Sequence, residues 1–85
     1  MLSQITKLLK SSFHCTHLDV RDDSAQHAGH AEALRSGGGH YSVMIIAEEF
    51  SGKTALERHR MVHAALKPLR DKIHALALTA KAAGE

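Results

Sequence analysis

The sequence contains one cysteine, one proline, no tryptophan and only three aromatic residues among 85. A single cysteine, Cys15, excludes a disulfide within the chain and leaves no cysteine-only metal site to one molecule. No apolar run approaches the roughly 18 residues of a membrane-spanning helix. We therefore expect a protein of a reducing compartment, assigned to the cytoplasm although an organelle matrix stays open, with no membrane partner.

The sequence also lacks a large excess of positive or negative charge, since its formal net charge is only +2. This excludes the strongly basic footprint of a dedicated nucleic-acid binder, although local basic patches stay open. A chain of 85 residues forms one domain, residues 1–85, around a small core and has little room for a deep catalytic cleft. The composition therefore favours a small non-enzymatic module.

Hydrophobic periodicity predicts a short series of helices and strands. Spacings of three and four predict a helix, whereas alternation predicts a strand that is buried on one side. We expect helices over residues 2–13 and 54–66, a short helical turn over 68–72, and strands over 17–22, 40–50 and 73–80. This order, α-β-β-α-(short α)-β, predicts an α+β two-layer sandwich, a three-stranded sheet with helices on one face.

The helix over residues 54–66 opens at Thr54, a favourable N-cap residue, and ends before Pro68. At 100° per residue one side of it gathers Leu56, His59, Val62, Leu66 and Leu69, so we expect His59 to face the core. His63 lies at the margin of this side.

Two arrangements of residues invite an enzymatic interpretation. His59 and His63 have the spacing of two zinc ligands, but Arg60 stands where a zinc hydrolase has its catalytic glutamate. Cys15 has histidine neighbours but no evident third group to orient a base. Neither arrangement predicts catalysis.

The segment SAQHAGHAEALRSGGGHY places three of the eight histidines, His27, His30 and His40, in a stretch that predicts a loop. His74 stands at the entry to the last expected strand. A histidine in that position is more often a hydrogen-bonded residue at the edge of a core than a ligand. A histidine loop opposite it would nevertheless give one adaptable and one fixed ligand. Two imidazoles can complete half of an iron-sulfur cluster, as on one iron of a Rieske centre.

Three segments resemble the BolA proteins over almost the whole chain. FSGKTALERHRMVHAALKPLRDKIHALAL is similar to the central signature of that family, with its Phe-x-Gly turn, Arg-His-Arg and His-Ala-Leu. DDSAQHAGH resembles the variable loop after the first strand. GGHYSV resembles the Ser/Thr-His-Phe-x-Val strand start, with Tyr41 in place of Phe.

The resemblance implies a type II KH-like fold and a monothiol glutaredoxin as partner, with which the chain would share a [2Fe-2S] cluster. The glutaredoxin would supply its own cysteine and that of a bound glutathione. His74 and a loop histidine, His27 or in second place His30, would be the ligands from this chain. The resemblance thus implies a non-enzymatic adaptor in iron-sulfur maturation or iron sensing. Alone, the protein would carry no cluster and be a monomer or weak homodimer.

A DNA-binding transcriptional regulator is the alternative, because some BolA proteins are described in this way. The basic residues for that role would be Lys53, Arg58, His59 and Arg60. Arg58 and Arg60 point about 160° apart on a helical wheel, so they form no single flat patch. The Gly-x-x-Gly clamp of KH domains is absent, since the turn reads FSGK, and no aromatic platform stacks bases.

Overall fold

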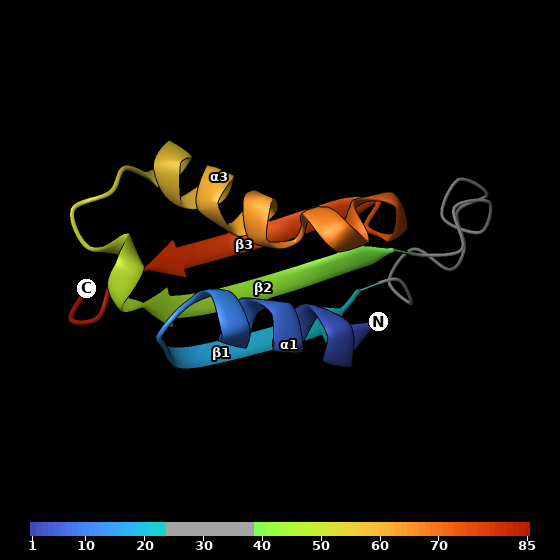
Figure 1. Ribbon diagram of the computed structural model, residues 1–85, viewed down its shortest axis with the longest axis horizontal. Helices are drawn as coiled ribbons and strands as arrows, with labels where there is room; N and C mark the ends of the chain where they lie inside the picture. Colours follow the sequence, from blue (N-terminus) through green and yellow to red (C-terminus); the bar gives the residue numbers. More distant parts are fainter. Residues whose placement is uncertain (24–38) are drawn as a thin grey trace.

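A computed structural model describes residues 1–23 and 39–85, so His27 and His30 lie outside the described part of the chain. The fold is α+β, with a three-stranded sheet covered by helices on one face (Figure 1). The elements are α1 (Leu2–Ser12), β1 (Cys15–Asp22), β2 (His40–Ala47), the 3-10 turn η2 (Glu48–Phe50), α3 (Ala55–Ala65), the 3-10 helix η3 (Lys67–Lys72) and β3 (Ala75–Lys81). The predicted element order and fold class are confirmed.

The sheet has the order β1-β2-β3, with β2 antiparallel to β1 and parallel to β3. The expected strand over residues 40–50 is too long, because the chain leaves the sheet after Ala47. The next three residues form η2, and this turn carries the side chain of Phe50 into the core, where it is fully buried. The 3-10 turn thus takes the place of the last three residues of the expected strand.

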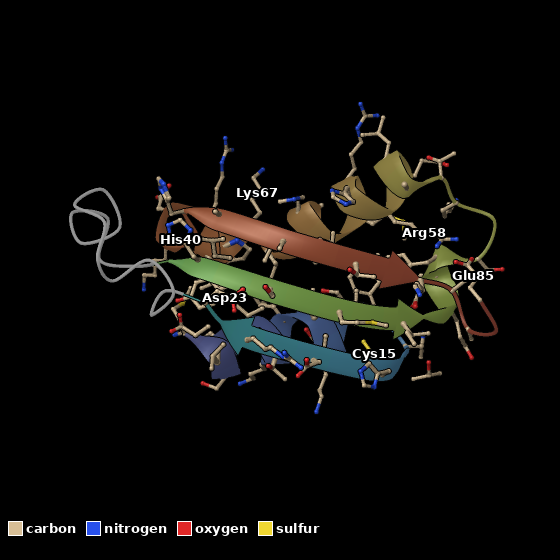
Figure 2. The ribbon with its side chains drawn as sticks, turned by 180° about the vertical axis from the view of Figure 1, so that it is seen from behind. Cys15, Asp23, His40, Arg58, Lys67 and Glu85 are labelled. Carbon is tan, nitrogen blue, oxygen red and sulfur yellow. The ribbon has the colours of Figure 1, made fainter. Side chains whose placement is uncertain are left out.

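The core lies between the sheet and the two long helices. Alternate residues of β2 face it, as the alternation of the sequence predicted, and all of them are buried: Tyr41, Val43, Ile45 and Ala47. The helices contribute Ile5, Leu9, Val62 and Leu66 to the same cluster. The opposite face of the sheet carries no helix among the described residues (Figure 2), and its β2 side chains are half-buried.

The side of α3 that meets the sheet differs from the predicted one. Val62 and Leu66 are buried as expected, but Leu56 is 59% exposed and His59 is exposed. Arg58 lies inward instead, with its side chain only 12% exposed and paired with Glu85. Since His59 follows Arg58 by 100° around the helix, the inward turn of Arg58 directs His59 to solvent.

The first turn of α3 is fixed by a reciprocal pair of hydrogen bonds. The backbone N–H of Glu57 donates to the Thr54 hydroxyl at 3.1 Å, and the backbone N–H of Thr54 donates to the Glu57 carboxylate at 2.9 Å. This is a capping box, so the predicted N-cap at Thr54 is confirmed. The capping box therefore fixes the residue at which α3 begins.

His14 and Glu49 join the loop after α1 to η2. The Glu49 carboxylate accepts from the His14 backbone N–H at 2.9 Å and lies 2.7 Å from His14 Nδ1. That side-chain hydrogen bond, with the charges of Glu49 and Glu48, raises the pKa of His14. Burial alone would raise the pKa of Glu49, but the hydrogen bonds at its carboxylate, from the His14 backbone first, lower it on balance.

The pair should stabilise the fold most within a window of pH. The folded-state pKa of Glu49 lies below the ordinary 4.5, so its contribution is complete above 4.5 and is lost as the pH falls. The folded-state pKa of His14 lies above the ordinary 6.5, so its contribution is complete below 6.5 and is lost as the pH rises. Urea unfolding of wild type and His14→Gln should therefore differ most between pH 4.5 and 6.5 and less at higher pH. A difference that stays constant with pH would contradict this.

Candidate metal centre

The imidazole of His74 lies beside that of His40 at one end of the sheet. The two ring centroids are 5.0 Å apart and the ring planes are inclined by 54°. His40 is the first residue of β2, and His74 directly precedes β3. Because β2 and β3 are parallel, with His40 opposite Ala75, both strands begin at the same rim of the sheet. His74 is exposed and His40 is half-buried, so this histidine pair is accessible from solvent.

Gly39 fixes the backbone on which His74 stands. Its carbonyl oxygen accepts hydrogen bonds from the backbone N–H groups of His74, at 2.8 Å, and Ala75, at 3.1 Å. Gly39 has φ +78°, a left-handed conformation that favours glycine. A Cβ atom there would lie 3.0 Å from the Lys72 carbonyl oxygen and 3.1 Å from the His74 nitrogen. Only glycine therefore fits this close contact without displacing the chain at His74.

Two hollows flank His74. The first, of about 460 Å³, lies where α3, η3 and β3 meet, and its charged side chains, Lys67 and Arg70, are both basic. The second, of about 660 Å³, is lined by Met1, Gly39, Tyr41, Asp71, Lys72, Ile73 and His74. His74 is thus exposed and borders both hollows.

The structure places the predicted site residues unequally. His74 lies at the predicted entry to β3. His27 and His30 are outside the described residues, so their role stays a prediction. His40 stands at the start of β2, where the predicted strand over residues 40–50 begins, and it contacts His74, which the sequence did not predict. Only a prediction that the second and third strands pair in parallel could have placed His40 beside His74.

Cys15 takes no part in this site. It lies at the start of β1 opposite Ala47, the far end of β2 from His40 (Figure 2). Seven residue steps along a strand separate the two ends by about 23 Å. Burial, and then the nearby charge of Glu49, raises the pKa of the Cys15 thiol. The protonated thiol is a poor nucleophile and a poor ligand.

The basic residues named for the DNA-binding alternative do not form one surface. Both Nη atoms of Arg58 pair with the Glu85 carboxylate, at 2.7 and 2.6 Å, and Nη1 also donates to the Ala80 carbonyl oxygen at 3.2 Å (Figure 2). Arg58 is thereby committed to holding the last residues against α3. Lys53, His59 and Arg60 are exposed. Within residues 1–23 and 39–85 no three potential metal ligands cluster, and none of the helices there has the length and apolar character that a membrane span needs.

The element order and the mixed three-stranded sheet define a small α+β domain of the type II KH-like class. The family model of BolA-like proteins matches residues 9–85. The chain therefore belongs to the BolA family.

Relatives of known sequence and structure agree with this assignment. The chain is 39% identical over 83 residues to an uncharacterized protein encoded in the cobS 5' region of a Sinorhizobium species, covering 95% of this chain and 89% of that protein. It is 34% identical to SufE-like protein 1 of Arabidopsis thaliana, covering 96% of this chain but only 24% of that longer protein. The solved structure of BolA1 from Arabidopsis thaliana superposes with a TM-score of 0.82 at 30% identity, covering 96% of this chain and 90% of that one.

The relatives' names bear on function only in general terms. They are names of BolA-like proteins. One relative, from Escherichia coli, is named a DNA-binding transcriptional regulator. It is 33% identical over 76 residues, covering 88% of this chain and 69% of that protein. The matched part of the SufE-like relative is described as its BolA domain. Some relatives are named chloroplastic or mitochondrial, so the assignment to the cytoplasm stays a prediction.

Replacing Gly39 tests how the site is held. Gly39→Ala should lower the free energy of unfolding by at least about 1–2 kcal/mol, because alanine resists the left-handed conformation. Its Cβ should also shift the NMR signals of the His74 and His40 rings. Gly52→Ala is the matched control, because Gly52 has φ +73° but nothing within 4 Å of its added Cβ. Equal shifts of the ring signals in both variants would contradict the role given to Gly39.

Proposed function

We propose that this protein is a non-enzymatic adaptor that shares a [2Fe-2S] cluster with a monothiol glutaredoxin, for iron-sulfur maturation or iron sensing. The observation that carries the proposal is the accessible imidazole pair of His40 and His74, 5.0 Å apart at the rim of the sheet. The resemblance to the BolA family supplies the expected partner and cofactor.

The donor set of the chain supports a shared rather than a resident cluster. A [2Fe-2S] cluster needs four ligands, and two imidazoles can serve one iron. Cys15, the single cysteine, lies at the opposite end of the sheet with its pKa raised. The thiolates for the second iron must therefore come from another molecule. The cysteines of the glutaredoxin and of glutathione would provide them.

His74 is the ligand that we assign first, because Gly39 fixes its backbone and both hollows open onto it. The second imidazole comes from His40, already in contact with it, or from His27 or His30 of the loop. Imidazole binds iron in its neutral form, so acid should weaken the site whichever histidine completes it.

Reconstitution with a monothiol glutaredoxin, glutathione, iron and sulfide tests the proposal. The complex should have visible absorption and circular dichroism that differ from those of the glutaredoxin-only cluster. His74→Ala should abolish that difference because it removes the fixed ligand. His17→Ala should leave the difference unchanged, because His17 is exposed at the far end of the sheet, paired with Ile46.

Two further variants identify the second ligand. Loss of the spectral difference in His40→Ala would assign His40, whereas loss in the His27→Ala/His30→Ala double variant would assign the loop. Identical spectra with and without the wild-type protein would refute the shared cluster.

DNA binding is the second candidate function, favoured by the name of the Escherichia coli relative and by the basic residues Lys53 and Arg60 that α3 and its preceding turn expose. Phosphate contacts make binding steeply dependent on salt. Arg60→Gln should then weaken binding more than Lys10→Gln on α1. No measurable binding to duplex DNA at low salt would exclude this function.

A further inference from the structure

The solvent side of α3 carries a second pair of histidines that the proposed function does not use. His59 and His63 are one turn apart, and their ring centroids are 6.2 Å apart with planes inclined by 42°. Both residues are exposed, unlike the core-facing His59 that the helical pattern predicted. Residues four apart on a helix share one face, so the two imidazoles project together into solvent.

This spacing suits chelation of one metal ion. Two nitrogens bonded to a tetrahedral ion at 2.0–2.1 Å lie roughly 3.4 Å apart. Exposed side chains can approach that separation by rotation of their rings, without any change in the backbone. The capping box at Thr54 and the buried Val62 hold the helix itself in place. The backbone positions of both ligands are thus fixed before an ion binds.

The surroundings decide which ions would bind. Glu57, the one acidic residue of α3, accepts a hydrogen bond from the Thr54 backbone N–H in the capping box. Of the three residues between the two histidines, the exposed one is the cation Arg60. Hard ions such as Mg²⁺ and Ca²⁺ prefer oxygen ligands, whereas imidazole suits zinc, copper and nickel. Two neutral nitrogen donors beside a cation therefore disfavour hard ions and retain selectivity for the transition metals.

We propose that His59 and His63 form a two-imidazole site for a divalent first-row transition-metal ion of the zinc and copper class. Water, or a ligand from a bound partner, completes the coordination. The site is separate from the rim pair, although His63 also lines the hollow that His74 faces. A competing arrangement, His63 with His74, uses the same hollow and makes a different prediction.

Calorimetric titration of the glutaredoxin-free protein with Zn²⁺ or Ni²⁺ tests the site in a His40→Ala/His74→Ala background, which lacks the rim pair. Retained binding would exclude the competing His63–His74 site. Adding His59→Ala or His63→Ala should each weaken this binding at least tenfold, since loss of groups that only orient a ligand already costs about 10–100-fold. His14→Ala and His17→Ala are controls that should change little. Excess Mg²⁺ should not compete, and lowering the pH should release the ion because binding needs neutral imidazoles.

Site-resolved NMR of the wild-type chain gives a second readout that does not depend on folding of the variants. Paramagnetic Ni²⁺ should broaden the amide signals around residues 59–63 at lower concentrations than those of residues 14–17. Broadening no greater at 59–63 than at 14–17, or unchanged affinity in His59→Ala, would overturn the proposal. Neither measurement involves a cluster or a glutaredoxin, so this site can fail while the proposed function stands, and the reverse.

Discussion

The parallel pairing of β2 with β3 is the constraint on which the candidate site depends. Parallel strands begin at the same end of a sheet, so the pairing sets His40 against the start of β3 and His74 beside it. The two residues are far apart in sequence, and no local pattern brings them together. Gly39 completes the arrangement, because its carbonyl oxygen accepts from the first two N–H groups of the returning chain. The left-handed conformation of Gly39, which favours glycine, thus helps to set the position of His74, the proposed ligand.

The remaining structure keeps that rim in place while leaving it open. The helices bury one face of the sheet, and Arg58 holds the last residues against α3 through Glu85. At the opposite end of the sheet, His14 and Glu49 tie the turn before β1 to η2. Packing and ion pairs therefore occupy the core and the far end, whereas His74 stays exposed between two hollows. The molecule separates the groups that stabilise it from the groups that we propose bind a metal.

The sequence predicted what depends on local periodicity. Alternation gave the buried positions of β2, and the Thr54 N-cap gave the start of α3, because both signals lie within a few residues of the structure they specify. The orientation of α3 was predicted wrongly. Apolar spacing favoured Leu56, whereas the observed face depends on Arg58 and on a partner 27 residues later. The His40 contact likewise depends on which strands pair, and the ligands in the loop stay predictions from family resemblance.

The proposed function requires this chain to give two histidine nitrogens to one iron of a shared cluster. Pulsed electron paramagnetic resonance of the reduced complex tests it directly when only this chain carries isotopically labelled histidine. Hyperfine couplings from two labelled imidazole nitrogens are expected, and both should disappear in His74→Ala, whose cluster would be that of the glutaredoxin alone. A wild-type spectrum with no coupling to labelled nitrogen would refute the shared cluster, because the cluster would then belong to the glutaredoxin alone.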